Sequence, residues 1–135
     1  MESTSQIQSE VVGWTAGLLH GDDDVAGFLT SGGTESILCG VLAARERAAA
    51  ERGITEPEMV VAESAHAAFH KAAHYFDIEP VSVPVDTSTW KADPAAMAEA
   101  CDDSTILLVG SAVSYAHGVI DPIAELGQLA LDRGV

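Results

Sequence analysis

The sequence predicts an α/β fold with a mostly parallel sheet and helices on both faces. Strand-like and helix-like segments alternate along the chain, and the helical segments are long enough for right-handed βαβ crossovers. The segment TILLVG, residues 105–110, is continuous, branched and apolar, which is typical of a strand covered on both faces. With 135 residues, 47% of them hydrophobic and 20% charged, the chain can bury one compact core.

Helical patterns occupy most of the chain between the strand-like segments. Apolar residues recur at helical spacing over residues 5–19. Residues 34–52 are rich in Ala, Leu, Glu and Arg and end at Gly53, a typical helix terminator. Asp93 and Pro94 form a helix-start pair, and Asp121-Pro122 is interpreted in the same way. The remaining predicted helices cover residues 64–76, 93–100 and 123–131.

The predicted strands lie between these helices. They cover residues 58–62, 79–85 and 105–110, after a short extended stretch over residues 26–30. Gly134-Val135 resembles a turn into a further strand, which suggests a piece of a larger protein. We therefore expect residues 1–135 to form a single, partial domain, with residues 1–21 as its N-terminal helix region.

Charge and cysteine content indicate which partners the chain does not bind and in which compartment it is expected. Twenty-one acidic and six basic residues give a formal net charge of -15, which repels nucleic-acid backbones and anionic lipid surfaces. Cys39 and Cys101 lie far apart and form no metal-binding pair, so no disulfide framework or zinc site is expected. The chain shows no signal peptide or membrane span, and we expect a cytoplasmic protein.

The stretch SGGT, residues 31–34, is the first candidate binding site. It precedes a predicted helix, where glycines let an anion approach the backbone and exposed N–H groups act as donors. The hydroxyls of Ser31, Thr34 and Ser36 could add hydrogen bonds to a phosphate. The stretch matches neither the dinucleotide fingerprint nor the nucleotide-triphosphate loop, and from the local sequence alone an ordinary helix cap with a tight turn is the favoured interpretation.

Three histidines at four-residue spacing form the second candidate. His66, His70 and His74 would share one helix face, which raises the alternative of a metal site. Zinc usually recruits a carboxylate or cysteine as well, so we predict no metal site. His66 differs from the other two because it begins the helix at the carboxyl end of a strand. There it can lie against a ligand ring or simply cap the helix.

The third candidate is the loop from Ser111 to Asp121, which follows the strongest strand and carries His117. Because carboxyl ends of parallel strands meet at one edge, this loop opens on the same edge as the other two candidates. Its serine, histidine and aspartate raise the alternative of hydrolytic triad chemistry. The G-x-S-x-G elbow that such hydrolases use is absent.

Together, three motifs resemble one enzyme family. TSGGTES (residues 30–36), SAHAAFHKAAHYF (64–76) and HGVIDPI (117–123) are similar to the pyridoxal-phosphate-dependent sphingosine-1-phosphate lyases, within the fold-type I decarboxylase-like enzymes. The resemblance runs from about Glu10 to the end of the chain. It implies that the chain is part of the cofactor-binding large domain of such an enzyme.

The resemblance also implies residue roles. Gly33 and Thr34 would hold the phosphate of pyridoxal 5'-phosphate, His66 would stack on its ring, and His117 would lie in a loop that approaches cofactor and substrate. The implied reaction cleaves a carbon–carbon bond of a sphingoid-base phosphate, a small phosphorylated amine. The products are a long-chain aldehyde and phosphoethanolamine, as in sphingolipid metabolism.

The chain departs from the family pattern at the lysine. Its two lysines, Lys71 and Lys91, do not match the family's Schiff-base lysine, which we expect beyond Val135 together with the aspartate that pairs with the pyridine nitrogen. No catalytic residue is therefore assigned within this chain, and the chain alone is expected to be inactive. The N-terminal region and small C-terminal domain of the family are also expected elsewhere. Family members work as homodimers.

Three hypotheses follow from the sequence. The first is a fragment of a pyridoxal-phosphate-dependent lyase. The second is a related amino-acid decarboxylase, which the same cofactor site would serve. The third is a non-catalytic α/β module that binds an anion or a protein partner, with the same residues acting as ordinary helix caps.

Overall fold

The computed structural model describes residues 2–135 and divides into two compact units, one ending at Ser36 and the other running from Ile37 to Val135. Helix α1 (Glu2–Leu18) lies in the first unit and matches the helix predicted over residues 5–19. Residues 26–30, predicted as a short extended stretch, belong to no helix or strand. A strand needs a hydrogen-bonded partner, and this segment has none among the described strands.

The second unit is built on a three-stranded parallel sheet. Its strands are β1 (Glu58–Ala62), β2 (Glu79–Val83) and β3 (Thr105–Val109), in the order β2-β1-β3. In the register, Val60 of the central strand lies opposite Val81 on one side and Leu108 on the other. The predicted parallel sheet is confirmed, and its strands end within two residues of the predicted positions.

Helices precede, connect and follow the strands of this sheet. They are α2 (Gly33–Arg52), α3 (Ala67–Phe76), α4 (Pro94–Ala100) and α5 (Ile123–Arg133). The Asp93 carboxylate accepts hydrogen bonds from the N–H groups of Ala95 and Ala96, which confirms the predicted start of α4. None of the described helices has both the length and the apolar character needed to cross a lipid bilayer.

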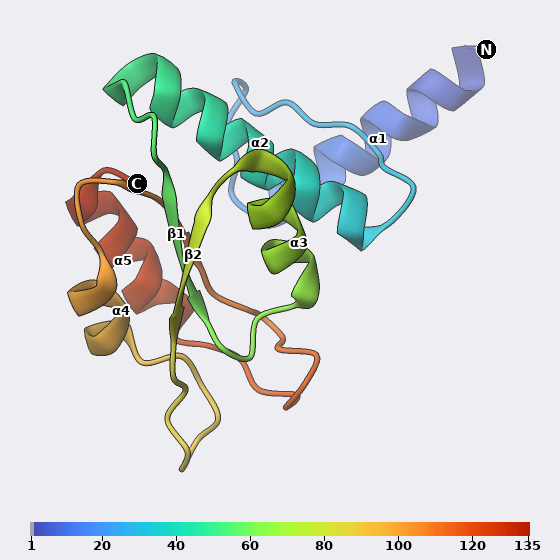
Figure 1. The fold of residues 1–135 in the computed structure, drawn as a ribbon. Coiled ribbons are helices and arrows are strands. Elements are labelled where there is room, and N and C mark those ends of the chain that lie inside the picture. Colours follow the sequence, from blue (N-terminus) through green and yellow to red (C-terminus); the bar gives the residue numbers. More distant parts are fainter. Residues whose placement is uncertain (1) are drawn as a thin grey trace. The chain divides into compact units, whose positions relative to one another are not determined.

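The central strand β1 separates two hydrophobic clusters. Met59 and Val61 pack with Val41 of α2 and with α3, whereas Val60 and Ala62 pack on the opposite side. This alternation follows from the two-residue period of a strand. Figure 1 shows α3 on one side of the sheet and α4 and α5 on the other. The predicted α/β class with helices on both faces is therefore confirmed.

Loops at the carboxyl ends of β1 and β3 carry His66 and His117, the residues of this unit that were predicted to bind the cofactor. The chain turns closely after β3, because a Cβ at Gly110 would lie 2.8 Å from Cδ1 of Leu126 and 3.0 Å from Cδ1 of Ile123. A side chain at residue 110 would force the side chains of Leu126 and Ile123 to shift. Gly110 therefore allows these two side chains of α5 to pack against the point where the loop toward His117 begins.

Candidate functional site

Gly33 and Thr34 begin helix α2, as the sequence predicted, and both are exposed. A Cβ built on Gly32 or Gly33 would have no heavy atom of the chain within 4 Å, and neither glycine has a positive φ. Neither close packing nor turn geometry within the described chain therefore requires glycine here. The two glycines leave open space beside the first N–H groups of a helix, which suits the approach of an anion.

Some hydroxyls around this helix start form hydrogen bonds within the chain, and one is left available for a ligand. The Ser31 hydroxyl and backbone N–H both donate to one carboxylate oxygen of Glu35, each at 2.6 Å. The hydroxyls of Thr30 and Ser36 form a 2.6 Å hydrogen bond with each other. The Thr34 hydroxyl takes part in neither interaction. Of the three hydroxyls predicted to bind a phosphate, that of Thr34 is the one available for it.

Glu35 places a carboxylate beside the same helix start. The hydrogen bond from the Ser31 hydroxyl, and then that from the Ser31 backbone, lower the pKa of the Glu35 carboxyl. Both bonds favour the charged form, so the carboxylate is ionised at neutral pH and held against Ser31. Negative charge in the first turn also interacts favourably with the helix dipole. Glu35 therefore orders the SGG turn but does not donate to an anion.

The substitution Ser31→Ala is expected to raise the pKa of the Glu35 carboxyl toward its ordinary value. It removes the hydroxyl hydrogen bond, the largest cause of the lowered pKa, and leaves the backbone bond in place. An NMR titration of the Glu35 side-chain carboxyl measures the change. Ser36→Ala is the control, since the Ser36 hydroxyl bonds to Thr30. An unchanged Glu35 pKa in Ser31→Ala would contradict this account of the turn.

His66 lies immediately before α3 and caps it. Its Nδ1 atom accepts a hydrogen bond of 3.1 Å from the Ala68 N–H, so Nε2 carries the proton of the neutral ring. The Tyr115 ring meets the His66 ring at 62°, with 5.0 Å between centroids. The local capping role considered from the sequence is confirmed. It also fixes the imidazole in one orientation at the carboxyl end of β1, as stacking on a ligand ring would need.

His117 lies at the tip of the loop that follows β3. The loop closes on itself through bonds from Ser114 N–H to the Val119 carbonyl (2.8 Å) and from Gly118 N–H to the Ser114 carbonyl (2.9 Å). One face of the His117 ring stacks on Trp90, with 4.9 Å between centroids and 25° between planes. Local sequence patterns did not predict this contact of Trp90, because its loop follows a different strand.

Asp121 is buried and joins two loops. Its Oδ1 atom accepts from the Ala92 N–H at 2.9 Å, and its Oδ2 atom from the Ser111 N–H at 2.7 Å. The Asp121-Pro122 pair was predicted to start the last helix, and α5 does begin at Ile123 with Pro122 as its N-cap, although no side chain caps it. Because both oxygens are occupied by backbone donors and His117 stacks on Trp90, the loop does not form a hydrolytic triad.

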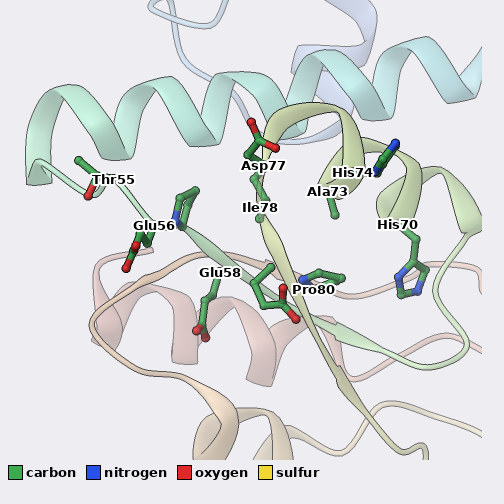
Figure 2. A pocket seen from close by; sticks show the side chains of 11 residues that line it. Thr55, Glu56, Glu58, His70, Ala73, His74, Asp77, Ile78 and Pro80 are labelled. Atoms are coloured by element: carbon green, nitrogen blue, oxygen red, sulfur yellow. The ribbon is translucent and has the colours of Figure 1, made fainter.

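His70 and His74 lie at the other end of the sheet from His117. Both line a pocket of about 610 Å³ formed by the C-terminal half of α3 and the starts of β1 and β2 (Figure 2). Burial raises the pKa of the Glu58 carboxyl in this pocket, and the charges of Asp102 and Glu79 raise it further. A pocket lined by carboxylates is unsuited to a phosphate. Across residues 2–135, no group of three or more His, Cys, Asp or Glu residues could hold a metal ion.

The four residues predicted to bind the cofactor therefore fall into two groups. Gly33 and Thr34 belong to the first unit, whereas His66 and His117 belong to the second. Within the second unit, His66 and His117 follow β1 and β3, which are adjacent strands of the sheet. Tyr115 contacts the His66 ring, Trp90 stacks on the His117 ring, and Asp121 links the loop of Trp90 to the loop of His117. Tyr115 and Asp121 lie in the third predicted candidate, the loop from Ser111 to Asp121, whereas Trp90 was not predicted as part of a site.

Comparison with known proteins decides the family. A family model described as the pyridoxal-dependent decarboxylase conserved domain matches residues 4–133. The chain belongs to the pyridoxal-dependent decarboxylase family. Its cofactor, predicted from the three sequence motifs, is therefore confirmed at the level of the family as pyridoxal phosphate.

Among pyridoxal-dependent decarboxylase family members, this one is similar to sphingosine-1-phosphate lyases. It is 45% identical to the sphingosine-1-phosphate lyase of Arabidopsis thaliana over 99% of its own length and 25% of that relative's length. The structure of the Burkholderia pseudomallei sphingosine-1-phosphate lyase matches with a TM-score of 0.93 and 44% identity, over 99% of this chain and 32% of that one. The resemblance that the motifs suggested is confirmed.

A decarboxylase of the same family is less similar. The structure of the Lactobacillus brevis glutamate decarboxylase matches with a TM-score of 0.82 and 25% identity, over 98% of this chain and 32% of that one. The shared fold thus extends to amino-acid decarboxylases, while sequence identity is higher with the lyases. This family member spans about a quarter of the length of the curated lyases that it matches.

Proposed function

We propose that this chain is the part of a pyridoxal-phosphate-dependent lyase that binds the phosphate and ring of the cofactor. The whole protein would cleave a sphingoid-base phosphate to a long-chain aldehyde and phosphoethanolamine. The observation that carries this proposal is the identity of 44–45% with sphingosine-1-phosphate lyases, against 25% with a glutamate decarboxylase.

Gly33 and Thr34 are proposed to hold the cofactor phosphate. The start of α2 presents backbone donors, and the helix dipole favours a negative charge there. The open space at Gly32 and Gly33 supports this role, because nothing else in the described chain requires the two glycines. The exposed Thr34 hydroxyl supplies a further donor to a phosphate oxygen.

His66 and His117 are proposed to contact the cofactor ring and its surroundings. The Ala68 N–H fixes the His66 ring from one nitrogen and leaves Nε2–H as a donor. Pyridoxal phosphate, when bound, supplies an electron sink for cleavage of the bond between C2 and C3 of the substrate. The contribution of His66 and His117 is to orient the ring and to cover it from water.

The lysine that carries the cofactor is proposed to come from outside these 135 residues. Lys71 lies on α3, with its Nζ atom 5.4 Å from the centroid of the Tyr75 ring. Lys91 lies in the loop after β2, where its carbonyl accepts a hydrogen bond from the Asp86 N–H. Neither lysine is assigned to the cofactor.

A segment exchange tests the proposed reaction. The matching segment of the Arabidopsis thaliana lyase is replaced by this chain, and release of aldehyde and phosphoethanolamine from sphingosine 1-phosphate is measured. We expect the chimera to cleave the substrate and His66→Ala to lower the rate at least about tenfold, since a ring-orienting contact is lost. His70→Ala is the matched control, because His70 lies in the pocket at the opposite end of the sheet.

The other outcomes of this experiment contradict the proposal. A folded chimera that binds pyridoxal phosphate but releases carbon dioxide from an amino acid, and no aldehyde, would favour the decarboxylase hypothesis. A folded chimera that binds no cofactor would favour a non-catalytic module.

Localisation and assembly also belong to the proposal. We propose a cytoplasmic protein, a prediction supported by its two free cysteines, Cys39 and Cys101. We further propose a homodimer for the whole protein, on the family resemblance alone.

A further inference from the structure

Two loops that follow different strands bring one aromatic pair together. Trp90 lies in the loop between β2 and α4, and His117 lies in the loop between β3 and α5 (Figure 1). Their rings stack at 4.9 Å between centroids, with planes 25° apart. Trp90 is 48% exposed, so hydrophobic burial alone does not account for its position. Its main contact of defined geometry is the His117 ring.

The loop after β2 holds Trp90 in an uncommon backbone conformation. Its backbone φ is +61°, a left-handed value that residues other than glycine rarely adopt. The Trp90 N–H donates to the Asp86 carbonyl at 2.6 Å. The Asp86 carboxylate accepts from the Ser88 N–H and hydroxyl and from the Thr89 hydroxyl, at 2.7–3.0 Å. This closed turn fixes the side from which the indole approaches His117.

Asp121 fixes the distance between the two loops. Its carboxylate is 3% exposed and spans from the Ala92 N–H, two residues after Trp90, to the Ser111 N–H at the start of the His117 loop. A charged acceptor with two backbone donors makes strong, directional hydrogen bonds in a buried setting. The carboxylate therefore acts as a clamp between the loop that carries Trp90 and the loop that carries His117.

We propose that Trp90 is a positioning residue that sets the ring orientation of His117, and that Asp121 is the clamp that allows the stack to form. The consequence of this stack, that it presents His117 to cofactor and substrate, rests on the proposed function. The stack covers one face of the imidazole, so a ligand meets the other face or the ring edge. The stack itself exists without any ligand.

The orientation of His117 is measured first, in the chain without cofactor. A stacked indole shifts the ring protons of His117 upfield in the NMR spectrum, and Trp90→Ala is expected to abolish this shift. Trp90→Phe is expected to restore part of it, since a smaller ring stacks in the same place. Because Trp90 is half-exposed, both variants are expected to keep the melting temperature close to that of the parent chain.

The clamp is measured with an isosteric substitution. Asp121→Asn places an amide NH2 group against one of the two backbone donors, so the His117 upfield shift is expected to diminish. Asp102→Asn is the matched control, because the Asp102 carboxylate accepts from the Ser104 N–H at the opposite end of the sheet. It is expected to leave the His117 signals unchanged.

Binding of pyridoxal phosphate supplies the second measurement. Trp90→Ala is expected to raise the dissociation constant by about 2- to 10-fold, as expected for the loss of one aromatic contact. Unshifted His117 signals in the parent chain, or signals unaffected by Trp90→Ala, would overturn the role of Trp90. An unchanged shift in a folded Asp121→Asn variant would overturn the clamp. If the stack behaves as expected but no variant binds the cofactor, the proposed function fails while the positioning role stands.

Discussion

Replacing Met59 by alanine is expected to lower the free energy of unfolding of the unit from Ile37 to Val135 by about 2–5 kcal/mol. Met59 lies on the central strand β1, is fully buried, and belongs to the cluster that joins α2 and α3 to the sheet. Truncation removes buried apolar surface and leaves a cavity that the flanking helices can fill only partly. Such a loss is a large share of the stability of a small unit.

Urea unfolding is monitored by the fluorescence of Trp90 in a Trp14→Phe background, so that the signal comes only from the unit of Ile37 to Val135. Met59→Leu is the control, because it keeps the volume and apolar character and is expected to cost less than about 1.5 kcal/mol. Equal losses of unfolding free energy in the two variants would show that stability does not depend on the side-chain volume at position 59. A loss below about 1 kcal/mol in Met59→Ala would contradict the packing described for β1.

Thr34→Val is expected to weaken the binding of pyridoxal phosphate about 10- to 100-fold. A hydroxyl that donates to a charged phosphate contributes about 1.5–3 kcal/mol, and valine keeps the shape while removing the donor. Equilibrium dialysis of the purified variant measures the change. Ser36→Ala is the control, because the Ser36 hydroxyl bonds to Thr30 within the chain. A comparable loss in both variants would indicate a disturbed helix start instead of a missing phosphate contact.

The sequence predicted most of the fold because local patterns determine it. Residues 58–62 form exactly the strand expected from their apolar run, and α4 begins at the predicted Asp93-Pro94 pair. Residues 26–30, predicted only as a short extended stretch, join no sheet, because pairing depends on a partner that local pattern does not specify. Helix α3 begins at Ala67, later than predicted, because His66 caps it and Ser64 and Ala65 belong to the preceding turn.

The candidate site was predicted less completely, for a tertiary reason. Helical spacing placed His66, His70 and His74 on one face, but His66 caps the helix while the other two line a pocket at the far end of the sheet. Asp121 has the local pattern of a helix start, and its true hydrogen-bond partners lie in a separate loop and at the end of β3.

The contact of Trp90 also depends on tertiary structure and could not be predicted from local sequence. Its stacking on His117 depends on two loops that meet only after the sheet has formed. A tryptophan in a polar connection was the only available signal, and one such residue predicts no particular contact. Gly33 and Thr34 could be placed at a helix start from the sequence because a helix start is a local feature, and their role in binding a phosphate stays a prediction.

The most direct test of the cofactor site compares pyridoxal phosphate with pyridoxal, which lacks the phosphate, in binding to the purified 135-residue chain. Affinities come from equilibrium dialysis, and borohydride reduction followed by mass spectrometry reports any covalent adduct. We expect tighter binding of pyridoxal phosphate, a difference that Thr34→Val largely removes, and no adduct on Lys71 or Lys91. Equal affinities for the two ligands, or an adduct on Lys71 that Lys71→Ala abolishes, would contradict this expectation.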